Sequence, residues 1–159
     1  MTIATKVNYF LEKNDIHYRS IRHYHSAGSI SSALAADIST KQMAKAVILE
    51  DHDGHKMMAV LPADKKISFS VINEKFNAKY HLISETDVHR MFSDCEAGAV
   101  PPVGGAYNIR VICDQLLDIL DEVYIEAGDH QTLLQLDKPA FKSLMSGAKH
   151  MRFGKESYH

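Results

Sequence analysis

The sequence predicts a mixed α/β (α+β) domain in which antiparallel hairpins alternate with short helices. Two observations lead to this class. Apolar runs of strand length are joined in pairs by tight turns, and polar capping residues precede the segments between them. The chain has 159 residues, of which 45% are hydrophobic and 24% charged, which suits one globular domain. We therefore expect a mixed, largely antiparallel sheet with helices packed against it.

Two pairs of apolar segments have the spacing of antiparallel hairpins. The first pair runs through Met43–Glu50 and residues 57–61, and Asp53 and Gly54 between them are favoured turn residues. Met43–Glu50 is apolar on both faces, which is typical of a central strand. A second hairpin is expected at residues 123–128 and 131–136. Two further strands are expected at residues 16–24 and 108–113.

Polar residues mark the starts of the predicted helices. Ser68, Ser84 and Asp114 each precede a helical segment, where the side chain can accept a hydrogen bond from a first-turn N–H. The other helices are predicted at residues 3–13, 29–39 and 137–145. In the second of these, the side chains expected to face inward are Leu34, Ala35 and Ile38.

The chain reads as one domain over residues 1–146 and a polar C-terminal tail over residues 147–159. Gly147 can end the last helix, and the residues after it are mostly polar, so we expect this tail to be loose.

Charge and cysteine content limit the classes of function. The formal net charge of −2 provides no broad positive field, so a nucleic-acid partner would be met through a local patch. Cys95 and Cys113 show no CxxC spacing, which favours a reducing compartment. The N-terminal segment lacks the pattern of a signal peptide, and no apolar run reaches membrane-spanning length. We expect a cytoplasmic protein without membrane contact.

Several well-known catalytic signatures are missing. The sequence contains no GxxxxGK[ST] phosphate loop, no GxGxxG fingerprint and no GxSxG elbow. Neither cysteine has a histidine nearby in the sequence to activate it. The sequence therefore predicts no bound cofactor.

Ten histidines raise the question of a metal site. His23 and His25 lie two apart on a predicted strand, so both side chains leave the same face. Zinc needs three or four ligands, and no HExxH motif or Cys/His cluster supplies them. Surface histidines are the simpler interpretation, and we predict no metal.

Two charged positions allow both a structural and a functional interpretation. Lys45 interrupts an apolar strand, either as an edge lysine that reaches water or as a cation at the mouth of a cleft. Asp129 and His130 follow Gly128, either as turn residues or as general acid–base groups. These residues alone leave both interpretations open.

The segment Cys95–Gly105, CEAGAVPPVGG, is a stiff apolar loop bracketed by glycines. Prolines hold such a loop rigid, and glycines let its backbone approach a ligand closely. The combination suits the wall of a small pocket with backbone N–H donors.

Taken together, these segments resemble the YbaK/ProX family of aminoacyl-tRNA editing domains over nearly the whole chain up to Met145. TKQMAKAVILED is similar to the family's lysine-bearing strand and places Lys45 at its key lysine. GAVPPVG is similar to its Gly-x-x-x-Pro loop, with Gly98 and Pro102 at the two defining positions. VYIEAGDHQTLLQLDKPAFKSLM resembles its final hairpin and helix.

The resemblance implies a sheet curved around a cleft, with helices outside, and an activity: hydrolysis of the ester between a wrong amino acid and tRNA. It implies that Lys45, Gly98 and Pro102 are the catalytic residues. The substrate-binding residues it implies are His25, Ala99, Val100, Pro101, Val103, Gly104, Gly128, Asp129 and His130. Val103 and the Gly-Asp-His turn depart from the common family pattern, which leaves the identity of the amino acid open.

In this interpretation a water molecule attacks the ester, assisted by the substrate's own 2′-hydroxyl, while Lys45 holds a phosphate or the ester oxygen. The expected partner is the acceptor end of a tRNA carrying a small amino acid such as alanine or cysteine. An aminoacyl-tRNA synthetase remains open as a second partner. The alternatives are a non-catalytic module that binds an aminoacyl or nucleotide-like ligand, and a metalloprotein built on the histidines.

Overall fold

The computed structural model describes residues 3–156, whose strands form three sheets. The five-stranded sheet has the order β5 (His81–Leu82), β2 (Ala44–Glu50), β3 (Lys56–Pro62), β6 (Arg110–Asp114), β9 (Lys149–Met151). The three-stranded sheet has the order β1 (Arg19–Arg22), β8 (Thr132–Asp137), β7 (Glu122–Glu126). The last sheet pairs β10 (Gly154–Glu156) with β4 (Lys65–Ile67).

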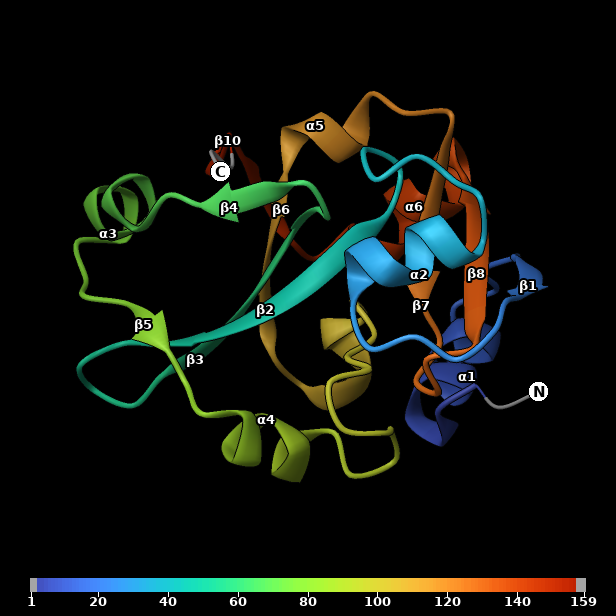
Figure 1. Ribbon diagram of the computed structural model, residues 1–159. Coiled ribbons are helices and arrows are strands. Elements are labelled where there is room, and N and C mark those ends of the chain that lie inside the picture. The colour runs from blue at the N-terminus through green and yellow to red at the C-terminus, as the bar shows by residue number, and fades with distance from the viewer. Residues whose placement is uncertain (1–2, 157–159) are drawn as a thin grey trace.

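Most neighbouring strands are antiparallel, as the sequence predicts. Only the β3–β6 and β6–β9 pairs are parallel within the described residues. The two larger sheets meet where Met43 bridges to Tyr124, whose N–H donates to Gln42 O at 2.9 Å. Figure 1 shows the long β2–β3 hairpin reaching away from β7 and β8, with helix α2 beside the junction. The predicted mixed, largely antiparallel class is confirmed.

Six α-helices and one 3-10 helix connect the strands of residues 3–156. They are α1 (Thr5–Lys13), α2 (Ser29–Ala35), α3 (Phe69–Phe76), α4 (Glu85–Met91), η1 (Gly104–Tyr107), α5 (Gln115–Asp118) and α6 (Lys138–Leu144). Ser68, Ser84 and Asp114 cap α3, α4 and α5 as predicted, each accepting a hydrogen bond from a first-turn N–H. None of these helices combines the length and the apolar character needed to cross a membrane.

Both predicted hairpins form, and the first is buried on its two faces. Ile48 and Met58 pack into the main core with residues of α1 and α6. Leu49 and Met57 face the opposite side and pack with Ile72 of α3. Strand β2 therefore lies inside its sheet, which explains why Met43–Glu50 shows no alternation of apolar and polar residues.

Helix α2 is shorter than predicted and presents a different face to the core. Leu34, expected to face inward, is 70% exposed, whereas Ser32 and Ala33 are buried. Ala33 packs in a small cluster with Met43 and Tyr124. Small side chains let a helix lie close to the strands beneath it, and here that close approach decides which residues face inward. The prediction for Leu34 is wrong.

The segment after Gly147 is ordered, so the prediction of a loose tail is wrong for residues 149–156. Strand β9 extends the five-stranded sheet, and β10 pairs with β4. Between them Phe153 is only 1% exposed, and its N–H and that of Gly154 donate to Asp114 Oδ2 at 3.1 and 2.7 Å. A domain boundary at residue 146 remains a prediction, and residues 157–159 of the predicted tail lie outside the described residues.

Replacing Phe153 by alanine tests this docking. Because the ring is buried among apolar neighbours, Phe153→Ala is expected to lower the free energy of unfolding by about 3–5 kcal/mol. Urea denaturation measures the change, with Lys155→Ala on the exposed side of β10 as the control, expected within about 0.5 kcal/mol of wild type. Equal stabilities for the two variants would contradict the docked arrangement.

Candidate functional site

A small cavity lies where the two larger sheets meet. The start of β2, the loop Gly98–Val100, residues of α2 and the β7–β8 turn contribute its lining. Its volume is about 130 Å³. Pockets for larger ligands usually begin at about 300 Å³. The cavity is therefore small for a ligand pocket.

Lys45 of β2 lines this cavity as a half-buried cation. Its Nζ donates to Ala63 O at 3.2 Å. Burial lowers the pKa of Lys45, and the nearby Asp64 carboxylate opposes part of this shift. A partly desolvated ammonium interacts more strongly with an anion than a solvated one does. The placement favours the functional interpretation of Lys45 over the edge-strand interpretation.

The glycine loop lines the same cavity through Gly98, Ala99 and Val100. Ala99 N donates to Glu96 O at 3.0 Å, which closes a turn with Gly98 at its third position and φ of +83°. A type II turn requires positive φ there, which glycine adopts without strain. The amides of Gly98 and Val100 have no hydrogen-bond partner within residues 3–156.

His130 connects the glycine loop to the β7–β8 turn. Its Nε2 lies 2.7 Å from Ala97 O, and a carbonyl only accepts, so Nε2 carries the proton. Its backbone N–H donates to Glu126 Oε1 at 2.6 Å. His130 is buried and has φ of +58°, a conformation that non-glycine residues adopt rarely. These bonds hold one edge of the cavity in a fixed shape.

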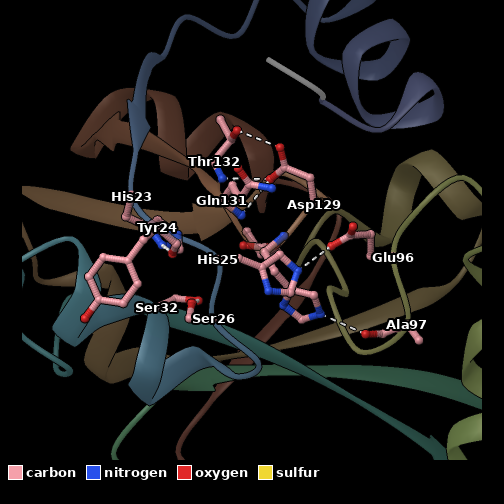
Figure 2. A network of polar contacts seen from close by, with 12 residues as sticks. His23, Tyr24, His25, Ser26, Ser32, Glu96, Ala97, Asp129, Gln131 and Thr132 are labelled. Atoms are coloured by element: carbon pink, nitrogen blue, oxygen red, sulfur yellow. Dashed lines mark hydrogen bonds and ion pairs between the residues drawn. The ribbon is translucent and has the colours of Figure 1, made fainter.

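His25 lies outside the cavity, next to His130. The two imidazole rings meet edge to face with centroids 5.4 Å apart. His25 Nε2 also lies 3.0 Å from Glu96 Oε2. Figure 2 shows His25 between the segment around Ser26 and the loop at Glu96 and Ala97. His25 therefore contacts His130, which lines the cavity, without lining the cavity itself.

The cavity brings together only part of the predicted set of site residues. Lys45, Gly98, Ala99, Val100 and His130 line it. The predicted residues that are not part of its lining are His25, Pro101, Pro102, Val103, Gly104, Gly128 and Asp129. The functional roles of both groups remain predictions.

The prolines and Gly104 support the loop from behind. Pro101, Pro102, Val103 and Gly104 are all buried. A Cβ built on Gly104 would lie 2.2 Å from Val111 Cγ2, so this position has no space for a side chain. The Pro-Pro segment therefore packs against the core, and the residues before it form the cavity wall.

Asp129 has the hydrogen bonds of a turn residue. Its Oδ1 accepts from the N–H groups of Gln131 and Thr132 at 2.9 and 2.7 Å, and its Oδ2 accepts from Thr132 Oγ1 at 2.8 Å. Figure 2 shows this arrangement around Asp129. The bonds favour the turn interpretation of Asp129 over the acid–base one.

Neither the two cysteines nor Ser32 is arranged as an activated nucleophile. Burial raises the pKa of Cys95 to about 12 and also raises the pKa of Cys113, so both remain neutral thiols. Ser32 lines the cavity, but its hydroxyl pairs with Ser26 Oγ at 2.8 Å instead of a histidine. Hydrolysis in this cavity would use water as the attacking group.

Two groups of possible metal ligands occur within residues 3–156, and both lie away from the cavity. They are Cys113, Asp118 and His150, and Asp51, Asp53 and His55. In the first, His150 Nδ1 lies 2.7 Å from Asp118 Oδ2 and Nε2 lies 2.9 Å from Met145 O. Both ring nitrogens face acceptors, and neither group includes the His23 or His25 that the sequence singled out.

Sequence reasoning missed Glu126, the last residue of β7. It lines the cavity, is 7% exposed, and interrupts the apolar run Val123–Gly128 just as Lys45 interrupts its own strand. That shared signal could have identified it. Desolvation raises the pKa of Glu126 to about 7, although the hydrogen bond from His130 N–H opposes the shift. Glu126 Oε2 is buried without a hydrogen-bond partner among the described residues.

The raised pKa of Glu126 predicts a pH-dependent effect of Glu126→Gln. Between pH of about 4.5 and 7 the folded state binds a proton that the unfolded state has released, so wild-type stability falls as pH rises. Glutamine still accepts from His130 N–H and does not ionise. Thermal unfolding should give equal Tm values near pH 4 and a higher Tm for the variant above pH 7. A Tm difference that does not change with pH would contradict this prediction.

Comparison with known proteins identifies a family whose matched region contains the cavity. A family model described as "aminoacyl-tRNA editing domain" matches residues 25–144, a range that contains every residue lining the cavity. The comparison with curated proteins finds no match.

Solved structures share the fold at low sequence identity. The hypothetical protein APE2540 has a TM-score of 0.83 and 22% identity, over 94% of this chain and 99% of its own. A proposed trans-editing enzyme for prolyl tRNA synthetase has a TM-score of 0.81 and 18% identity, over 96% of each chain. A proposed signal transduction protein from Marinobacter aquaeolei VT8 has a TM-score of 0.78 and 17% identity, over 98% of this chain and 31% of its own.

Proposed function

Because the chain belongs to the family of aminoacyl-tRNA editing domains, we propose that it is a deacylase that hydrolyses the ester of a mischarged tRNA. The observation that carries this proposal is the cavity of about 130 Å³, which Lys45 and the glycine loop both line. Neither Ser32 nor either cysteine supplies an activated nucleophile there. Editing is needed because one methylene changes binding by only about 1–3 kcal/mol. A cavity of this size suits a small acyl side chain such as that of alanine.

In the proposed reaction, water attacks the ester carbonyl and the bond to the ribose oxygen breaks. The products are the free amino acid and a tRNA whose ribose oxygen has gained the proton. The substrate's 2′-hydroxyl assists, as the resemblance to the family implies. The free amides of Gly98 and Val100 would stabilise the negative oxygen of the tetrahedral intermediate. Lys45 would attract the ester oxygen or the terminal phosphate.

Helix α2 offers a surface for the rest of the acceptor end. Ser29 and Ser32 line the cavity, while Ile30 and Leu34 of the same helix are 50% and 70% exposed. A nucleobase that leaves the cavity entrance could pack on these apolar side chains, since base contacts of this kind need no specific hydrogen bonds. The exposure of Leu34 thus agrees with a substrate larger than the cavity.

Deacylation of a panel of mischarged tRNAs tests the proposal. Alanyl-tRNA(Pro) is the leading candidate and cysteinyl-tRNA(Pro) the second. We expect hydrolysis of at least one of them well above the rate in buffer. Lys45→Ala should lower kcat/KM by about tenfold or more, because a charge-assisted contact is worth about 1.5–3 kcal/mol.

Lys56→Ala is the matched control, because Lys56 lies at the exposed far end of the same hairpin. Its kcat/KM should equal that of wild type. A folded Lys45→Ala variant with full activity would remove Lys45 from the site.

Chelators should leave the deacylation rate unchanged. The proposed chemistry uses backbone donors and a lysine, and the two groups of possible metal ligands lie outside the cavity. The rate is measured before and after dialysis against EDTA. Loss of activity that zinc restores would support a metal-dependent reaction instead.

The second candidate function is a non-catalytic module that binds an aminoacyl or nucleotide-like ligand. The fold forms 31% of a proposed signal transduction protein, a setting in which binding alone would suffice. The tRNA panel decides between the two: this candidate requires binding of a charged tRNA without release of the amino acid.

A further inference from the structure

Glu126 lines the cavity and carries one carboxylate oxygen without a hydrogen-bond partner among the described residues. Its Oε1 accepts from His130 N–H at 2.6 Å, whereas Oε2 is buried and has no hydrogen-bond partner within residues 3–156. The residue is more than nine-tenths buried and belongs to the cavity lining. A buried carboxylate oxygen is unfavourable unless a donor or a cation completes its bonding.

The cations of the described residues do not complete this bonding. Lys45 lines the same cavity, but its Nζ is within hydrogen-bond reach of Ala63 O and forms no ion pair with Glu126. The ring of His130 has its proton on Nε2, which donates to Ala97 O. Glu126 Oε2 is therefore unpaired within the part of the chain that the structure describes.

The cavity also limits what that ligand can be. It presents an ammonium on β2 and a carboxylate on β7, with the donors of the glycine loop completing the wall. A small acyl ester with a free amino group matches all three features. Its carbonyl and ribose oxygens can accept hydrogen bonds from Lys45 and the loop amides, and its α-ammonium can form an ion pair with a carboxylate.

Building on the function proposed above, we propose that Glu126 Oε2 binds the α-ammonium of the aminoacyl group and restricts the site to esters with a free amino group. Esters with a neutral or blocked α-substituent would leave this carboxylate unpaired. The site would then reject acylated tRNAs by the charge at the α-carbon as well as by the size of the side chain.

The test compares two substrates of equal size. Alanyl-tRNA(Pro) carries an α-ammonium, and lactyl-tRNA(Pro) carries a neutral hydroxyl in the same place. For each, kcat/KM is divided by the rate of spontaneous hydrolysis, which removes the difference in intrinsic ester reactivity. Wild-type protein should prefer the alanyl ester by about tenfold or more, the value of one charge-assisted contact. Glu126→Gln should abolish that preference by slowing only the alanyl ester.

Glu122→Gln is the matched control, since Glu122 is the exposed first residue of the same strand. It should keep the wild-type preference. Circular dichroism and Tm establish that both variants are folded.

Each result decides a different question. A preference that survives in Glu126→Gln, or an equal loss of rate on both esters, would overturn the assignment of the ammonium to Glu126, and the equal loss would point to a role for Glu126 on the attacking water. If wild-type protein hydrolyses neither ester nor any other tRNA of the panel, the proposed function itself fails.

Discussion

The hydrogen bonds of His130 are the constraint on which the site depends. The loop at Ala97 and the β7–β8 turn are about thirty residues apart in the chain, and His130 joins them through its ring and its backbone. Glu96 N adds a bond to Gly128 O at 2.9 Å. Because the glycine loop has few side chains of its own for anchorage, this bridge fixes where its amides lie. A site that stabilises charge gains from donors already held in position.

The sequence predicts those parts of the fold that are formed by residues close together in the chain. Asp53 and Gly54 encode a turn, and Ser68 and Ser84 encode helix starts, because the residues that form these features are neighbours in the chain. The position of β9 beside β6 has no such local signal. The segment is held by the burial of Phe153 in the core and by a hydrogen bond from Phe153 N–H to the Asp114 carboxylate, and both partners come from distant parts of the chain. A polar, glycine-containing sequence gives no sign of such a partner.

The candidate site shows the same division. Lys45 and Gly98 were found because a charge in an apolar strand and a glycine-bracketed loop are unusual by themselves. Glu126 is an equally unusual charge, but it precedes an Ala-Gly turn, a position that is also typical of an ordinary hairpin. Asp129 was given weight that its turn hydrogen bonds do not support. Both acids are buried, and what distinguishes them is that both oxygens of Asp129 accept hydrogen bonds whereas Glu126 Oε2 accepts none within the described residues.

The free protein gains no stability from the ionised form of Glu126. Glutamine would accept the same bond from His130 without the cost of burying a charge, so the hydrogen bond alone does not explain a carboxylate at this position. Lys45 carries the corresponding cost on the facing strand, since burial disfavours its charge as well. Lys45 and Glu126 thus line one cavity without pairing with each other, and burial disfavours the charged form of each. A ligand that paired with both groups would offset this cost on binding, and this is why we propose a binding site here.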